Sequence, residues 1–250
     1  MEGDIVVRGI VLTAALYGEY DKRLVLLTDT LGRITVFANS ARREKSPLKA
    51  ACQSFTMAKF RLRQGRNAYT LISAEIENSF REMALDMEKM CYGAYMCELM
   101  DFFTHEGVRA AAELNLLYVS FLALLDDRYD NRLIKTVFEL KTLDIEGIGL
   151  HMGSCVISGD KENIHHIDYS LGGAVCDSCL KRARHPVRIS AGALYTMRYI
   201  LSSGISKVYN FKLEEHLLKE VSDLTTGYLK RNADREFKSL MILENITESM

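Results

Sequence analysis

The chain has 250 residues, of which 48% are hydrophobic and 26% charged, a balance typical of globular proteins. This length is enough for one large domain or two smaller ones. No basic amino-terminal segment precedes an apolar run, and no stretch approaches the roughly 18 consecutive apolar residues that span a bilayer. We therefore expect a soluble, cytoplasmic protein. Six cysteines are too few for a disulfide scaffold in a chain of this size.

Charge is distributed unevenly along the sequence. The whole chain carries a net charge of −1, yet residues 33–66 hold nine basic residues against one acid, a net charge of +8. The remainder carries −9, since the two parts sum to −1. A concentrated positive segment in a neutral chain indicates contact with a polyanion.

The first 80 residues have the composition of β-strands. Segments rich in Val, Ile, Phe, Tyr and Thr are separated by turn signals at Tyr17-Gly18, Leu31-Gly32 and Gln64-Gly65. Five short strands within about 75 residues predict a small closed barrel of the OB type, because closure removes exposed sheet edges. The expected strands are 5–12, 23–28, 33–38, 55–63 and 68–75.

From about residue 82 the apolar residues change to the three-and-four spacing of helices. The sequence therefore predicts an α+β protein, with an OB-type barrel domain over residues 1–80 and a helical domain over residues 81–250. Residues 151–187 are expected to form an irregular, cysteine-bearing insert, because glycines recur there without a helical period. The expected helices are about 82–103, 108–126 and 131–146, a helix from the N-cap Ser190 to about 202, and a final helix with a stripe from Leu213 to Tyr228.

A row of cations follows the fourth expected strand. Lys59, Arg61 and Arg63 alternate with apolar residues, so all three point to one face at a spacing of about 6.6 to 7 Å. Three cations in a row can track a phosphate backbone. The alternative is a solvated strand face, but the basic loop before the strand favours a groove for single-stranded nucleic acid. The expected DNA-binding residues are Arg33, Arg42, Arg43, Lys45, Lys59, Arg61 and Arg63, with Lys49 in the same loop.

Aromatic residues of the barrel segment are candidate platforms for nucleic-acid bases. Phe37, Phe55 and Tyr69 lie within or beside the basic segment, and aromatic rings stack on bases without sequence preference. Aromatic side chains also fill the cores of small barrels. Both interpretations stay open at this point.

Three cysteines in the insert have the spacing of a metal knuckle. Cys155 precedes the pair Cys176-x2-Cys179, and such a pair supplies two thiolates from one turn while a distant turn supplies further ligands. A fourth ligand is expected three residues past Cys155, where the sequence has Ser158, a poor zinc ligand. The insert thus predicts a structural zinc site with one ligand missing, or free thiols in a loop that folds without metal. The remaining candidates for a fourth ligand are His151, His165, His166, His185 and water.

No motif of a known enzyme class stands out. The chain lacks His-Glu-x-x-His and the phosphate-binding Gly-x4-Gly-Lys-Ser/Thr sequence. The zinc-deaminase signature is also absent, since Cys176 follows Val175 rather than proline. Glu98, within an apolar helix, is expected to make a helix-packing hydrogen bond rather than act as a base. We expect a protein without enzymatic activity; the alternatives are a zinc-dependent enzyme acting on nucleic acid and a scaffold that binds protein only.

Short motifs occur in a fixed order from Arg8 to Cys179. They are Arg8–Leu12, Tyr17–Asp21, Leu27–Arg33, Ala41–Ser46, Phe138–Lys141, Cys155–Gly159 and Gly172–Cys179. In this order they resemble the RecO family of recombination mediators. The family's zinc knuckle has four cysteines, so Ser158 departs from the pattern and puts metal binding in doubt.

The resemblance implies a function and partners. It implies a mediator that binds single- and double-stranded DNA through its OB fold, anneals complementary strands and helps to load recombinase in DNA repair, in the cytoplasm and at the nucleoid. It also implies RecR and the carboxyl-terminal tail of the single-stranded DNA-binding protein as partners. An acidic, hydrophobic-ended peptide needs an apolar groove with a basic rim, for which the helical domain is the expected host. Candidates for that rim, or for a second DNA patch, are Lys181, Arg182, Arg184 and Arg188.

Overall fold

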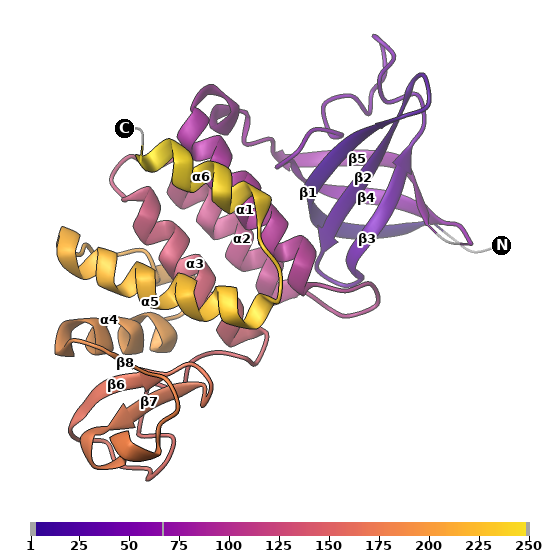
Figure 1. Cartoon of the computed structure of the whole chain (residues 1–250). Helices are drawn as coiled ribbons and strands as arrows, with labels where there is room; N and C mark the ends of the chain where they lie inside the picture. The colour runs from indigo at the N-terminus through magenta and orange to yellow at the C-terminus, as the bar shows by residue number, and fades with distance from the viewer. Residues whose placement is uncertain (1–3, 67, 249–250) are drawn as a thin grey trace. The chain divides into compact units, whose positions relative to one another are not determined.

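The computed structural model describes residues 4–66 and 68–248 (Figure 1). The chain divides into two compact units. The first unit comprises the residues up to Leu125 together with those from Phe237 onward, and the second is Asp126–Glu236. The division into an OB-type domain over residues 1–80 and a helical domain over residues 81–250 stays a prediction. Within the described ranges, no helix combines the length and the apolar character needed to cross a membrane.

The first unit is built on a closed five-stranded barrel, as the sequence predicted. Its strand order is β1-β2-β3-β5-β4, and β3 pairs with β5 in parallel while the other neighbours are antiparallel. A five-stranded closed arrangement of this kind is that of OB folds. The strands are β1 Ile5–Tyr17, β2 Asp21–Thr28, β3 Gly32–Ala38, β4 Met57–Gln64 and β5 Tyr69–Asn78.

Strand β1 is longer than expected, because a bulge interrupts the sequence pattern from which its end was predicted. The sequence predicted an end at Leu12, whereas the strand continues to Tyr17. Its pairing with β2 shifts register between Val11 and Thr13. A bulge interrupts the two-residue alternation of apolar side chains and leaves the pairing intact on both sides. The second half of β1 therefore forms a long hairpin with β2 whose side chains lack the periodicity of a half-buried strand.

Helices α1 (Met87–Phe103) and α2 (Ala111–Leu124) complete the first unit with the 3-10 turn η1 (Arg81–Leu85) and helix α6 (Lys238–Glu248). Figure 1 shows α6 alongside α1, where the ring of Phe237 packs edge-on against Phe102 at a centroid distance of 5.6 Å. Glu98 of α1 accepts hydrogen bonds from the backbone N–H and the hydroxyl of Ser239. The helix-packing role expected for Glu98 is confirmed. Helix α6 itself was not predicted, since the last expected helix is the one whose apolar stripe ends at Tyr228.

Phe55 links the barrel to its helices. The residue adopts a positive φ of 72°, which is strained for an aromatic residue, and its N–H donates to the carbonyl of Val11. The ring packs against Phe121 of α2, edge-to-face at 5.4 Å. Gly93 of α1 lies beside it, where an added Cβ would meet Met83 and the Phe55 ring. Phe55 is therefore a packing residue of the first unit.

The second unit combines three helices with a small sheet. The segment 151–187 was expected to be irregular, but it contains an antiparallel sheet of order β7-β6-β8. Strands this short carry too few residues to produce a periodic signal. Ser190 caps α4 as predicted, since its side chain accepts from the N–H of Ala193. The elements are α3 Asn131–Ile145, β6 Ile164–Asp168, β7 Gly173–Cys176, η2 Asp177–Arg182, β8 Pro186–Arg188, α4 Ala191–Ser202, η3 Ile205–Lys207 and α5 Glu215–Ala233.

Buried Asp168 organises the loops around this sheet. Its Oδ1 atom accepts from the N–H groups of Ser170 and Leu171, and its Oδ2 atom accepts from those of Arg184 and His185, at 2.6 to 3.2 Å. Burial would raise the pKa of this carboxyl group, but the donors, led by the Ser170 hydroxyl, hold the pKa well below its usual value. One carboxylate thus joins the turn after β6 to the turn before β8.

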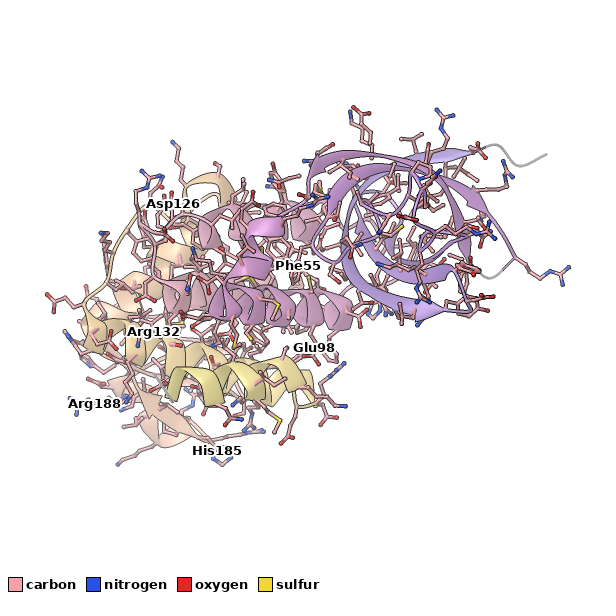
Figure 2. The ribbon with its side chains drawn as sticks, turned by 90° about the horizontal axis from the view of Figure 1, so that it is seen from above. Phe55, Glu98, Asp126, Arg132, His185 and Arg188 are labelled. Atoms are coloured by element: carbon pink, nitrogen blue, oxygen red, sulfur yellow. The ribbon has the colours of Figure 1, made fainter. Side chains whose placement is uncertain are left out.

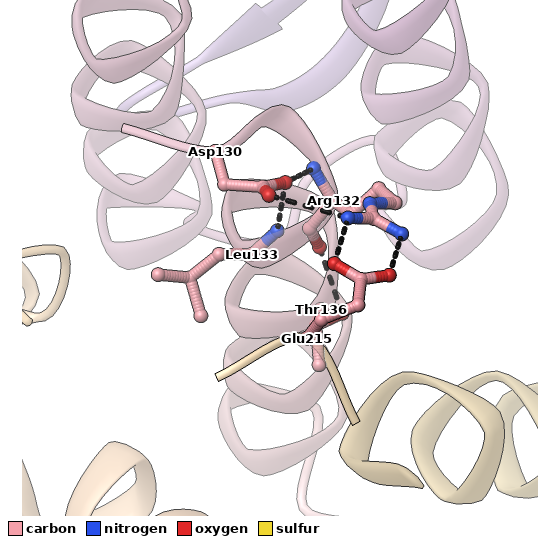
Figure 3. Close-up of polar contacts among 5 residues, drawn as sticks. All are labelled: Asp130, Arg132, Leu133, Thr136 and Glu215. Atoms are coloured by element: carbon pink, nitrogen blue, oxygen red, sulfur yellow. Dashed lines mark hydrogen bonds and ion pairs between the residues drawn. The ribbon is translucent and has the colours of Figure 1, made fainter. Parts of the chain in front are cut away.

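Polar contacts connect α3 to α5 (Figure 3). Asp130 caps α3 by accepting from the N–H groups of Arg132 and Leu133, and the Arg132 guanidinium donates to both carboxylate oxygens of Glu215 at 2.6 and 2.7 Å. The pair is exposed and contributes little to stability, but its two-point geometry fixes the start of α5 relative to the start of α3.

Candidate nucleic-acid interface and cysteine cluster

The basic loop between β3 and β4 is fixed from inside the barrel. Ala41 and Cys52 are fully buried in the barrel core, and the Lys22 ammonium donates to the Cys52 carbonyl at 2.7 Å. A loop held at both ends presents its remaining side chains outward in a fixed arrangement. The exposed cations of this loop are Arg42, Arg43, Lys45 and Lys49.

The tip of the β1–β2 hairpin lies against this loop. The Arg42 N–H donates to the Tyr20 carbonyl at 2.8 Å, and its guanidinium donates to the Glu19 carbonyl at 2.9 Å. The Arg43 guanidinium lies over the Tyr20 ring, 5.0 Å from its centroid. Large apolar side chains are exposed here, among them Leu16 at 69% and Tyr17 at 52%. We call this region the hairpin–loop surface and define it as Leu16, Tyr17, Tyr20, Arg42, Arg43 and Lys45.

The aromatic residues available for stacking differ from those that the sequence suggested. Tyr69 is buried in the barrel and presents no face to solvent, and Phe55 is half-buried with its ring packed on Phe121 of α2. Phe37 packs against Tyr17 at a centroid distance of 4.8 Å. The exposed rings of the barrel are Tyr17 and Tyr20, which were not among the residues expected to stack on bases. Their position on both sides of the Gly18 turn is the sequence signal that could have identified them.

The cations of β4 form a second, separate group. Phe60 and Leu62 are fully buried, and Lys59, Arg61 and Arg63 are exposed, so the predicted alternation is correct. β4 runs antiparallel to β1, with Lys59 opposite Arg8 and Leu62 opposite Ile5. The row Lys59, Arg61 and Arg63, called the β4 row below, therefore extends toward the start of β1, away from the hairpin tip.

Acidic neighbours reduce the charge of the β4 row. Arg63 forms an ion pair with Asp4 at 3.3 Å, and Lys59 lies opposite Glu75 in the pairing with β5. Arg33, also expected to bind DNA, instead donates to the Thr104 carbonyl at 3.1 Å and to Asp101 at 3.0 Å. Its contacts join β3 to the end of α1. The structure thus brings together Arg42, Arg43 and Lys45 but does not bring Arg33 or the β4 row to them.

The three cysteines of the insert converge. Cys155, Cys176 and Cys179 are all buried, and their sulfur atoms lie within 4.8 Å of one another. We call them the cysteine cluster. Cys155 lies in a tight turn that is closed by hydrogen bonds from its N–H to the Asp160 carbonyl and from the Gly159 N–H to the Cys155 carbonyl. The spacing predicted this convergence, which is the arrangement that a tetrahedral metal requires.

Hydrogen bonds favour the thiolates of Cys155 and Cys176 in the cysteine cluster. Burial would raise the pKa of Cys155, but donation from the Ser158 hydroxyl and from the N–H groups of Cys176, Ser158 and Ile157 lowers it to about 6. The Ser158 and Ser178 hydroxyl groups lower the pKa of Cys176. Although the Ser158 hydroxyl also lowers that of Cys179, burial and the sulfurs of Cys176 and Cys155 leave it raised. The arrangement is therefore suited to neutralisation by a cation.

Two of the histidines proposed as fourth ligands have other contacts. His151 is hydrogen-bonded to Ser154 at 3.0 Å, and His165 is paired with Asp177 at 2.9 Å. Among the residues that the structure describes, the metal-ligand group contains the three cysteines and no histidine. Figure 2 shows His185 and Arg188 extending from the small sheet, and both side chains are exposed. The other expected rim cations, Lys181, Arg182 and Arg184, are exposed as well.

Comparison with known proteins identifies the family. The profile described as "Recombination protein O N terminal" matches residues 1–80, and that described as "Recombination protein O C terminal" matches residues 84–241. The DNA repair protein RecO of Symbiobacterium thermophilum is 31% identical over 244 residues, covering 96% of each chain. The proteins of that name from Alkaliphilus metalliredigens and Clostridium perfringens are each 30% identical, covering 95% and 96% of this chain and 98% and 97% of theirs. With two profiles and full-length relatives in agreement with its barrel and cysteine cluster, the chain belongs to the RecO family.

Proposed function

We propose that the protein is a recombination mediator of DNA repair that binds single- and double-stranded DNA, promotes annealing and helps to load recombinase, in the cytoplasm and at the nucleoid. The observation that carries the proposal is the hairpin–loop surface, where exposed tyrosines lie beside Arg42, Arg43 and Lys45. Aromatic rings next to cations are the composition of sequence-tolerant single-strand binders. Membership of the RecO family supports the same function.

Annealing requires little chemistry of such a surface. Two phosphate backbones repel one another, and fixed cations relieve this repulsion while the base edges stay free to pair. Stacking of a base on Tyr17 or Tyr20 would hold a strand open without reading its sequence. The reaction needs neither a nucleophile nor a nucleotide. The protein is therefore proposed to act without catalysis.

The test is binding and annealing measured with purified protein and no nucleotide. We expect single-stranded DNA of unrelated sequences to bind with similar affinity, and binding to weaken steeply as salt rises. Complementary strands should anneal faster with the protein than without it, and the lengths of the strands should stay unchanged. Binding that is insensitive to salt would contradict the proposal, and cleaved or modified strands would favour a zinc-dependent enzyme instead.

The cysteine cluster is proposed to hold a structural zinc ion. Cys155, Cys176 and Cys179 would bind it, and the ion would cross-link the turn after Cys155 to the end of β7. The residues fit such an ion because three buried sulfurs converge and their neighbours donate hydrogen bonds to them. Elemental analysis should find about one zinc per chain, and Cys176→Ser should lower thermal stability without affecting DNA binding. Metal-free protein with unchanged unfolding would contradict this.

Partner binding is proposed for the second unit. The partners are RecR and the tail of the single-stranded DNA-binding protein. A hollow of about 580 Å³ lies between α4 and the segment after α3, lined by Tyr195, Arg198 and Met152 among others. Exposed tyrosines and one arginine suit an acidic peptide with an apolar end. Fluorescence anisotropy of such a peptide should show weaker binding to Tyr195→Ala, and equal affinity would assign the peptide to another surface.

A further inference from the structure

Ser158 lies where the missing fourth ligand of the cysteine cluster would be. Its Oγ atom is 3.5 Å from the Cys176 sulfur, and the sulfur atoms of Cys155 and Cys179 lie within 4.8 Å of that sulfur. In a tetrahedral site with zinc–sulfur bonds of about 2.3 Å and zinc–oxygen bonds of about 2.0 Å, ligand sulfur and oxygen atoms are about 3.5 Å apart. The serine oxygen therefore already has the separation of a ligand.

Asp160 determines which way the serine hydroxyl points. The Ser158 hydroxyl donates to the Asp160 Oδ2 atom at 2.8 Å, and the Asp160 N–H donates back to Ser158 Oγ at 3.3 Å. The hydroxyl has one proton, which serves either the thiolates of the metal-free cluster or the Asp160 carboxylate. When the proton is directed to the carboxylate, the serine oxygen presents lone pairs to the cluster. A carboxylate that accepts a proton from a ligand raises the basicity of that ligand. This contact offsets the weakness of a neutral hydroxyl as a zinc ligand.

The turn that carries Ser158 is held independently of its side chain. The Cys155 N–H donates to the Asp160 carbonyl at 2.7 Å, and Gly159 has a positive φ of 84° that suits glycine. Asp160 itself is farther from the cluster than Ser158, since its Oδ2 atom is 4.0 Å from the Cys176 sulfur. The serine oxygen is therefore nearer to the Cys176 sulfur than the carboxylate, which accepts a longer contact from the same sulfur.

We propose that Ser158, oriented by Asp160, supplies the fourth ligand of the metal site formed by Cys155, Cys176 and Cys179. The inference rests on the structural metal proposed above. With Ser158 as the fourth ligand, the site needs neither a histidine nor a water molecule in that position. Asp160 is a positioning residue in this site, because it acts through Ser158 rather than on the metal.

The test uses the full chain loaded with Co²⁺, whose absorption spectrum reports the ligand set. We expect Ser158→Ala to weaken cobalt binding by about 10- to 100-fold, and Asp160→Asn to weaken it in the same direction. Ser158→Cys should add a fourth thiolate, raise the thiolate-to-cobalt charge-transfer intensity by about one third and tighten binding. Glu162→Gln is the matched control, since it removes one exposed acid from the same segment, and should leave affinity and spectrum unchanged.

The outcomes separate the two proposals. Cobalt affinity and spectra equal to those of the unmodified protein in both Ser158→Ala and Asp160→Asn would assign the fourth position to water and overturn the inference, leaving the metal site in place. Loss of binding in Asp160→Asn alone would make the carboxylate the direct ligand and also overturn it. Failure of the unmodified protein to take up cobalt or zinc would overturn the metal site and the inference together, whatever the result of the DNA-binding assays.

Discussion

Removing the loop cations of the barrel should weaken DNA binding more than removing the β4 row. One triple variant replaces Arg42, Arg43 and Lys45 with alanine, and the other replaces the β4 row. Each phosphate contact by a cation contributes about 0.7 to the log–log salt slope for single strands, so loss of three contacts lowers the slope by about 2. At about 0.1 M salt this corresponds to a loss of affinity of about 100-fold.

The β4 row should contribute less because its charges are partly neutralised. Arg63 is paired with Asp4, which leaves two cations of the row, Lys59 and Arg61, and a slope change of about 1.4. Equilibrium binding of a fluorescent oligonucleotide, titrated at several salt concentrations, measures both slopes, and circular dichroism checks that both variants fold. A larger slope change from the β4 row than from the loop set would refute the reasoning and move the DNA path to that face.

Three further predictions concern stability. Phe60→Ala should cost about 3 to 5 kcal/mol in urea unfolding and leave the salt slope of DNA binding unchanged, because the ring is fully buried in the barrel; an unchanged midpoint would mean that the core tolerates the cavity. Asp168→Asn should cost about 2 to 4 kcal/mol at about pH 7. Since the folded pKa of Asp168 is lowered, its contribution is full above the unfolded pKa of about 3.9 and is lost as pH falls below it, so the difference between the two proteins should shrink at about pH 3. Glu98→Ala removes the acceptor at the start of α6 and should lower stability by about 1 kcal/mol. Hydrogen exchange should become faster in α6 and stay unchanged in α3.

The barrel could be predicted from sequence because its determinants are local. Each strand carries β-branched and aromatic residues between turn signals, and the alternation on β4 placed Phe60 inside and Arg61 outside correctly. The extension of β1 to Tyr17 could not be predicted, since the bulge after Val11 shifts the alternation. The strands of the insert were missed because β7, Gly173–Cys176, is too short to show a period.

The candidate sites were predictable only where spacing decides geometry. Two cysteines in one turn must lie close together, so the convergence of Cys176 and Cys179 followed from their separation of three positions. The role of Arg33 did not follow from sequence, because its partner Asp101 comes from a helix far along the chain. In the same way Asp160 was overlooked as a neighbour of the cluster, since only the folded turn shows that its carboxylate meets Ser158.

The position of α6 has a consequence for the order in which the protein is synthesised. The first unit is made of two segments that the whole second unit separates in sequence. While the ribosome translates Asp126–Glu236, α1 has already emerged, but Phe237 and the donors of Ser239 that pack on it do not yet exist. The second unit can therefore finish folding before the first, although it is made later. Shortening the chain at its carboxyl end would accordingly damage the unit that contains the amino-terminal barrel, and a fragment ending at Leu125 would leave the α6-binding face of α1 open to solvent.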